Sequence, residues 1–121
     1  MSLTSRTRDA LDAFNNAEGA GHYDNLTQYL SSHHVIIHRV DDITPIQGTA
    51  AEVVNLFNHY QTKIWPRFVY DVSSYKEVGR IVWVKGKYYD TNASGQTSVN
   101  VTCGYHFDPD NNIDVAFAYP S

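Results

Sequence analysis

The spacing of the hydrophobic residues changes once along the chain, from a helical period in the first half to a strand period in the second. Near the start, Ala10, Leu11, Phe14 and Ala17 recur at intervals of three or four residues, apart from one adjacent pair. Residues at this spacing share one face of an α-helix, so the pattern predicts an amphipathic helix. We expect this helix to stop at Gly19.

Two further helices and a strand are expected before the middle of the chain. Tyrosine and leucine recur at helical spacing over residues 23–30, which predicts a second, shorter helix. The run Val35-Ile36-Ile37 is β-branched throughout and favours a strand that reaches about residue 40. Thr49 and Glu52 have the spacing of a capping box, which predicts a third helix beginning just after Gly48.

The second half of the chain predicts a run of antiparallel strands. Hydrophobic and polar residues alternate over residues 68–75, 80–90, 98–107 and 113–119. Short segments rich in Gly, Asn and Asp separate these strands, so consecutive strands should pair as antiparallel neighbours. Helices followed by a strand meander predict an α+β fold. We expect a curved antiparallel sheet wrapped around three helices from the first half of the chain, forming a cone with an internal pocket.

Size and composition narrow the class of protein. The chain has 121 residues and no internal linker, so residues 1–121 are expected to form one domain. Cys103 is the only cysteine, which excludes an intrachain disulfide. A net charge of −4 argues against nucleic-acid binding, which requires a basic surface. Because no segment has the roughly 20 apolar residues of a membrane span, we expect no membrane partner and a cytoplasmic location.

The order of these elements resembles the nuclear transport factor two-like superfamily, whose members are also described as SnoaL-like proteins and as cystatin-like α+β cones. Two local patterns carry the resemblance. Residues 20–26 (AGHYDNL) are similar to a turn of that family, and residues 46–51 (IQGTAA) are similar to the start of one of its helices. The resemblance covers nearly the whole chain and implies the fold. It says little about activity, because the superfamily includes isomerases, dehydratases, hydrolases, cyclases and proteins that only bind or dimerise.

Within that superfamily, ketosteroid isomerase is similar over residues 11–38 without a gap. By position, the resemblance places the general base of that family at His38 and the two donors of its oxyanion hole at Phe14 and Cys103. His38 still allows proton transfer. A phenyl ring donates no hydrogen bond and a thiol donates a weak one, so the oxyanion hole is not preserved. Losing one such donor typically costs about 10²- to 10³-fold in rate, and steroid isomerisation is therefore rejected.

His38 is the candidate catalytic residue. His34, Ile36 and His38 alternate onto one strand face, and the resemblance places this face inside the cone. An imidazole titrates near neutral pH and can act as a general base, and Asp41 or Asp42 in the following loop is a candidate to orient it. The alternative is a half-buried histidine bonded to a backbone carbonyl. A shift of one residue in strand register would turn His38 outward.

Aromatic and apolar residues of the third helix and the meander are expected to line the pocket together with Phe14. The tyrosine hydroxyls among them are candidate hydrogen-bond donors to a ligand, although the same rings could fill the cone as core. The candidate ligand-binding residues are Phe14, Phe57, Tyr60, Phe68, Tyr70, Val101, Cys103, Tyr105 and Phe107. Apolar surroundings should raise the pKa of the Cys103 thiol and make it a poor nucleophile.

Neither a metal nor a cofactor is expected. His34 and His38 are four residues apart, which is roughly 13 Å along a strand and too far for one shared ion. Residues 108–119 have the approximate spacing of a calcium loop, but Ile113 stands where glycine is required and Tyr119 where a glutamate is required. We interpret this segment as a hairpin turn.

Two kinds of function remain. The first is a cofactor-free lyase, isomerase or cyclase, in which His38 removes a proton beside the carbonyl of a small apolar substrate and Tyr60 or Tyr105 hydrogen-bonds the enolate. The second is a non-catalytic module that binds a ligand or dimerises, with a filled or inert cone. A cavity of about 300 Å³ or more that contains the His38 ring would favour a ligand or substrate. We also expect a homodimer through the convex sheet face, where Trp83 or Val84 would lie beside small polar residues.

Overall fold

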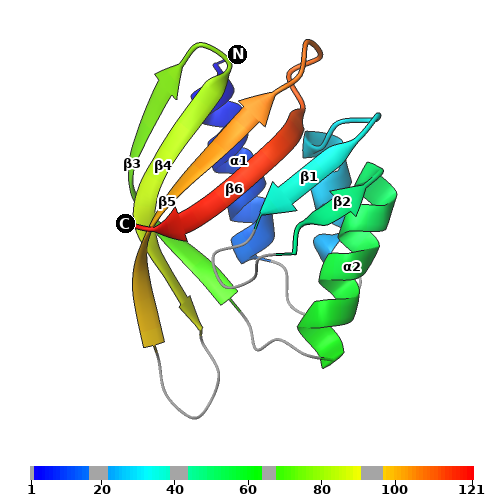
Figure 1. Cartoon of the computed structure of the whole chain (residues 1–121), viewed down its shortest axis with the longest axis horizontal. Helices are drawn as coiled ribbons and strands as arrows, with labels where there is room; N and C mark the ends of the chain where they lie inside the picture. Colours follow the sequence, from blue (N-terminus) through cyan, green and yellow to red (C-terminus); the bar gives the residue numbers. More distant parts are fainter. Residues whose placement is uncertain (1, 17–21, 39–43, 64–67, 91–96) are drawn as a thin grey trace.

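The computed structural model describes residues 2–16, 22–38, 44–63, 68–90 and 97–121, with only the backbone at residues 22, 60–63, 68, 69, 88–90 and 97 (Figure 1). Its helices are α1 (Leu3–Asn15), the 3₁₀ helix η1 (His22–Tyr29) and α2 (Ala50–Lys63). Its strands are β1 (Val35–His38), β2 (Ile46–Gly48), β3 (Phe68–Val78), β4 (Ile81–Asp90), β5 (Thr97–Phe107) and β6 (Ile113–Pro120). The α+β class and the three helical segments are confirmed.

These strands form one mixed sheet in the order β2-β1-β6-β5-β4-β3. The antiparallel meander from β3 to β6 confirms the four strands expected in the second half of the chain. β1 runs parallel to β6, with Ile37 opposite Ala116 and His38 opposite Phe117, so the sheet is not wholly antiparallel as expected. β2 was not expected, because three residues are too few to reveal a strand period.

Side-chain caps begin two of the helices. At the start of α1, the Ser2 hydroxyl accepts a hydrogen bond from the Ser5 N–H at 3.1 Å. Before α2, the Glu52 N–H donates to the Thr49 hydroxyl at 3.2 Å, and the Thr49 N–H donates to the Glu52 carboxylate at 3.1 Å. The bond from the Thr49 N–H holds the pKa of Glu52 below its ordinary value. The capping box is therefore confirmed.

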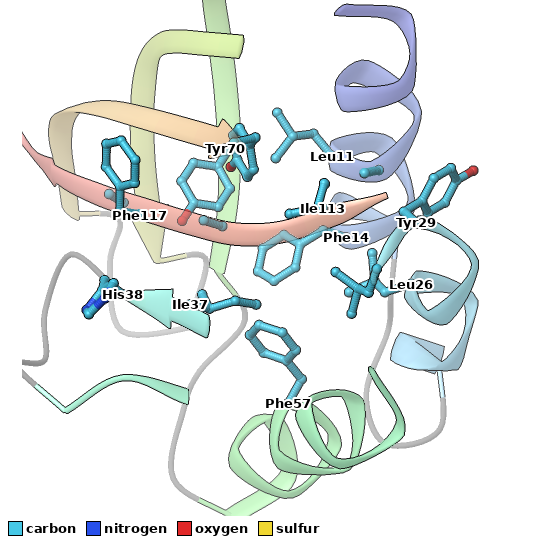
Figure 2. Close-up of a pocket in the computed structure, with 15 residues that line it drawn as sticks. Leu11, Phe14, Leu26, Tyr29, Ile37, His38, Phe57, Tyr70, Ile113 and Phe117 are labelled. Atoms are coloured by element: carbon cyan, nitrogen blue, oxygen red, sulfur yellow. The ribbon is translucent and has the colours of Figure 1, made fainter. Parts of the chain in front are cut away.

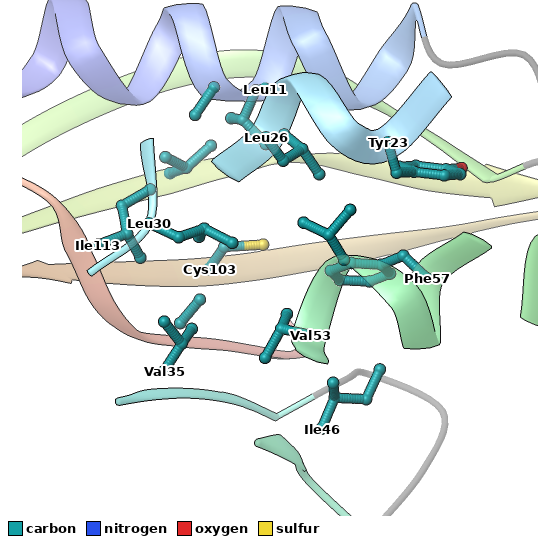
Figure 3. Close-up of a cluster of buried hydrophobic side chains, with 14 of the residues drawn as sticks. Leu11, Tyr23, Leu26, Leu30, Val35, Ile46, Val53, Phe57, Cys103 and Ile113 are labelled. Atoms are coloured by element: carbon teal, nitrogen blue, oxygen red, sulfur yellow. The ribbon is translucent and has the colours of Figure 1, made fainter. Parts of the chain in front are cut away.

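The helices cover one face of the sheet, which we call the inner face. Its side chains include Ile37 of β1, Val82 and Val84 of β4, Val101, Cys103 and Tyr105 of β5, and Ala116 and Ala118 of β6. Helix α1 packs on β3, β4 and η1, and α2 packs on η1 and β2; α1 and η1 lie behind the sheet in Figure 1. Leu11, Val35 and Val53 belong to the cluster of buried hydrophobic side chains that forms the core (Figure 3). Within the described ranges, no helix is long and apolar enough to cross a membrane.

Candidate functional site

A cavity of about 100 Å³ lies between the helices and the inner face of the sheet (Figure 2). Helices α1, η1 and α2 form one wall, and strands of the sheet form the other. The lining residues are Ala10, Leu11, Phe14, Leu26, Tyr29, Leu30, Ile37, His38, Phe57, Tyr70, Tyr105, Ile113, Ala116, Phe117 and Ala118. All of these side chains are aliphatic or carbocyclic aromatic except His38, so the wall offers mainly apolar contact.

Phe14 is the centre of an aromatic group on the helical side of the cavity. Its ring centroid lies 5.5 Å from that of Tyr23, 5.9 Å from that of Phe57 and 5.6 Å from that of Tyr70. Tyr23 and Phe57 also stack on each other at 5.7 Å. Tilted and edge contacts at such distances are favourable. They join α1, η1, α2 and β3, so the shape of this wall depends on all four elements.

Strand β5 brings a phenol and a thiol to the sheet side of the site. Tyr105 lines the cavity, and Cys103 lies two residues earlier on the same strand face, 1% exposed. The two side chains lie close enough to influence each other's pKa. Burial raises the pKa of Cys103 to about 11 and raises the pKa of Tyr105 well above its ordinary value. The raised pKa expected for Cys103 is confirmed, and both groups stay protonated at neutral pH.

The expectation that His34, Ile36 and His38 face the interior is wrong. Val35 is completely buried and Ile37 packs against the core, whereas His34 and His38 are exposed. The strand therefore has the register in which the histidines point outward. Burying branched aliphatic side chains is favourable because it removes apolar surface from water, whereas burying an imidazole would require a hydrogen-bond partner for each ring nitrogen.

His38 nevertheless borders the cavity, because it is the last residue of β1 and lies beside Phe117 of β6. Figure 2 shows its ring at the edge of the group, away from the rings of Phe14 and Phe57. An exposed imidazole at this rim can reach a bound molecule only where that molecule extends out of the cavity.

The predicted ligand-binding residues divide into three groups. Those that line the cavity are Phe14, Phe57, Tyr70 and Tyr105. Those that are buried in the core without lining it are Val101, Cys103 and Phe107. The side chains of Tyr60 and Phe68, and the candidate orienting residues Asp41 and Asp42, lie outside the described residues.

Much of the wall comes from residues that the hydrophobic pattern did not single out as a site. They are Ala10, Leu11, Leu26, Tyr29, Leu30, Ile37, Ile113, Ala116, Phe117 and Ala118. The clearest available signal was the pair of alanines on β6, since small side chains at alternate positions of a buried strand leave space opposite the helices.

A histidine and a carboxylate are paired away from the cavity. His106 Nδ1 and Asp114 Oδ1 are 2.6 Å apart, between β5 and β6, and both side chains are partly exposed. Across the described part of the chain, no group of three or more His, Cys, Asp or Glu side chains is arranged to hold a metal ion.

The outer face of the sheet, opposite the helices, carries an aromatic cluster formed by Trp83, Phe117 and Tyr119. The rings of Trp83 and Phe117 meet edge to face at 5.5 Å, and Phe117 stacks on Tyr119 at 6.3 Å. Gly104 lies between Trp83 and Phe117 in the strand register, and a Cβ at this position would overlap the Phe117 ring. Tyr119 is 45% exposed, so the cluster presents aromatic surface to solvent.

Comparison with known proteins identifies the fold. No family model matches the chain, and no functionally curated protein matches its sequence. Among solved structures, it is similar to a putative SnoaL-like polyketide cyclase from Shewanella denitrificans OS-217, with a TM-score of 0.78 and 10% identity over 98% of this chain and 90% of that one. An NTF2-like protein of unknown function from Burkholderia pseudomallei K96243 has a TM-score of 0.76 and 14% identity, over 100% and 92% of the two chains. An LEH-like epoxide hydrolase from M. tuberculosis has a TM-score of 0.72 and 15% identity, over 97% and 84%. At these identities the likeness is one of fold.

Proposed function

We propose, from the premise that this chain has the fold of SnoaL-like and NTF2-like proteins, that it binds a small, mainly apolar molecule between its helices and its sheet. The observation that carries the proposal is the cavity wall, where His38 is the one lining residue that is neither aliphatic nor carbocyclic aromatic. Small-molecule sites in proteins are typically lined in this way, with a few placed polar groups that orient the ligand.

The size of the cavity limits the ligand to about one ring. Its volume of about 100 Å³ is well below the roughly 300 Å³ of a drug-sized ligand site. It is closer to the engineered apolar cavity of about 150 Å³ that binds benzene. A polycyclic molecule would need the walls to move, whereas the volume of a six-membered ring is close to that of the cavity.

Catalysis with His38 as general base is the second candidate function. Two observations favour it: His38 borders the cavity, and the similar structures include a putative polyketide cyclase and an epoxide hydrolase. We prefer binding because the exposed imidazole lies at the rim and no carboxylate is among the lining side chains described. Proton abstraction would also need a donor for the developing enolate, which Tyr105 supplies in this second scheme.

Titration with benzene, followed by amide NMR, tests the binding function. We expect saturable one-to-one shifts centred on residues that line the cavity. The variant Ala118→Leu adds three carbon atoms to the wall and should abolish the saturable shifts, whereas Ala51→Leu on the exposed side of α2 should retain them. Absence of saturable binding by the unmodified protein would refute the proposal.

Deuterium exchange into cyclohexanone tests the catalytic alternative. If His38 acts as a base, the protein should accelerate exchange of the protons beside the carbonyl, and His38→Ala should remove that acceleration. Equal rates for the two proteins would leave binding as the function.

We also propose that the outer face associates with a second copy of the chain. What supports this is the cluster of Trp83, Phe117 and Tyr119, since tryptophan, tyrosine and phenylalanine are enriched at protein interfaces. Phe117 also lines the cavity, but Trp83 and Tyr119 do not, and the outer face lies opposite the helices, so association would leave the helical wall of the cavity uncovered.

A further inference from the structure

Among the described residues, hydrogen-bonding groups are sparse around the cavity, and Tyr105 is the lining tyrosine that comes from an inner strand of the sheet, since Tyr70 lies on the edge strand β3. The lining side chains with polar atoms are Tyr29, His38, Tyr70 and Tyr105. His38 is exposed at the rim. In Figure 2 the hydroxyl of Tyr29 points away from the other lining residues, and its ring is covered by the Arg6 guanidinium, whose Cζ lies 5.1 Å from the ring centroid.

Tyr105 enters from the middle of the sheet. Its neighbours across the register are Val82 on β4 and Ala116 on β6, both buried apolar residues. A buried phenol usually has a hydrogen-bond partner, because leaving its O–H unpaired in an apolar environment costs free energy. Tyr105 is partly buried and is one of the residues that line the cavity.

The thiol beside Tyr105 would be a poor hydrogen-bond partner for its hydroxyl. Cys103 lies beside it, two residues earlier on β5, and sulfur is a weak donor and a weak acceptor. An oxygen acceptor placed in the cavity would form a stronger bond with the phenol O–H than a thiol can. The aliphatic side chains of this inner-face region, Val84, Val101 and Ala118, offer no polar atom, and the other phenols near Tyr105 are those of Tyr70 and Tyr75.

We propose that the natural ligand is a small ring compound that carries one carbonyl oxygen, and that this oxygen accepts a hydrogen bond from the Tyr105 hydroxyl. The inference rests on the proposed function, since it requires a ligand in the cavity. A carbonyl suits the site better than a hydroxyl or an amine, because the raised pKa of Tyr105 keeps its hydroxyl a donor and the described lining residues include no carboxylate to accept a proton from the ligand.

A pair of matched probes separates the hydrogen bond from the shape of the site. Cyclohexanone and methylenecyclohexane have nearly the same shape and differ in whether oxygen or a CH₂ group ends the double bond. Both are titrated by NMR into the unmodified protein and into Tyr105→Phe, which removes only the hydroxyl. We expect Tyr105→Phe to weaken cyclohexanone about 3- to 10-fold, the usual worth of one hydrogen bond, and to leave methylenecyclohexane unchanged.

Tyr119→Phe is the matched control, since it removes a hydroxyl from an exposed tyrosine of the outer face that does not line the cavity. It should change neither affinity. The carbonyl stretching band of bound cyclohexanone gives a second readout: it should lie at lower wavenumber in the unmodified protein than in Tyr105→Phe, which a purely structural role of the tyrosine would not produce.

The outcomes are distinct. Equal loss of both probes in Tyr105→Phe, or no loss of either, would overturn the role of Tyr105 while leaving apolar binding intact. Failure of the unmodified protein to bind either probe would overturn the proposed function and this inference with it.

Discussion

The side-chain amide of Asn15 makes two hydrogen bonds with the backbone of Tyr70. Its Nδ2 donates to the Tyr70 carbonyl oxygen at 2.8 Å, and its Oδ1 accepts from the Tyr70 N–H at 2.9 Å. Tyr70 lies on β3, the edge strand of the sheet, so the amide occupies the place that a neighbouring strand would take. Asn15 is the last residue of α1 and follows Phe14. The pair therefore fixes the end of the helix, and with it the aromatic wall of the cavity, to the sheet.

We expect Asn15→Ala to lower the free energy of unfolding by about 1–3 kcal/mol, because it leaves two partly buried backbone groups of Tyr70 without this partner. Urea denaturation measures the change. Asn16→Ala, at the exposed neighbouring position, should cost less than half as much. Equal losses for the two variants would show that the paired hydrogen bonds contribute little.

Two glycines of the sheet should differ in their tolerance of a methyl group. A Cβ at Gly86 would overlap the backbone carbonyl of Asp71, beside the irregular pairing between Val72 and Ser74, whereas the atoms nearest to a Cβ at Gly104 belong to the ring of Phe117. A ring can rotate away more easily than a backbone can shift.

Gly86→Ala should therefore destabilise the protein by about 3 kcal/mol, at the upper end of the cost of overpacking, and Gly104→Ala by about 1 kcal/mol. The double variant Gly104→Ala/Phe117→Leu should recover part of the second loss. Thermal unfolding gives the comparison, and a reversed order of the two glycines would contradict it.

Cys103 should resist thiol reagents in the folded protein. At pH 8, raising its pKa from 9.0 to about 11 lowers the thiolate fraction about 100-fold. Ellman's reagent should consequently react slowly with the native protein and rapidly after unfolding in urea. Fast labelling of the native protein, at the rate of the urea-unfolded chain, would contradict the burial of this thiol.

The same shift predicts how stability depends on pH. Because the folded pKa lies above the unfolded one, the unfolded chain releases the thiol proton first, and the folded state loses stability as the pH rises from 9 toward 11. Cys103→Ala should reduce the slope of the unfolding free energy over this interval, and a second contribution from Tyr105 should remain.

Association through the outer face predicts a mass of about 27 kDa by light scattering, twice the 13.7 kDa of one chain. Replacing Trp83 and Tyr119 by serine should shift the protein toward the monomer, because it removes the aromatic surface that the proposed dimer would bury. Val99→Ser is the control, since Val99 is exposed to a similar extent (44% against 45% for Tyr119) but follows the alternation of the inner face. A monomeric unmodified protein at high concentration would refute the proposal.

Local sequence patterns predicted most of the helices and strands. The features that they could not predict were determined by packing between residues far apart in the sequence. The pair formed by Thr49 and Glu52 predicted the start of α2, because a capping box involves only four consecutive residues. In contrast, Val35, Ile36 and Ile37 are all apolar, so their order carries no alternation from which to choose the buried face. The outward position of His38 followed from pairing with β6, about 80 residues away in the sequence.

The site was predicted in part for the same reason. Aromatic residues such as Phe14 and Tyr105 were recognised by type and strand face, but the volume left between them depends on how the helices pack. Residues that make room, Ala116 and Ala118 among them, carry no chemical signature. A cavity of about 100 Å³ is the space left unfilled after many side chains have packed, and no single sequence motif predicts it.

The parallel junction of β1 with β6 also orders events during synthesis. As a ribosome extends the chain, β1 and β2 can form their own hairpin early, yet they can join the rest of the sheet only after β6 has emerged, because β6 is their sole neighbour on that side. Until then the nascent chain exposes Val35 and Ile37 to water and to chaperones. The ability to bind a ligand should thus arise late in translation, when the strand that completes the sheet has been synthesised.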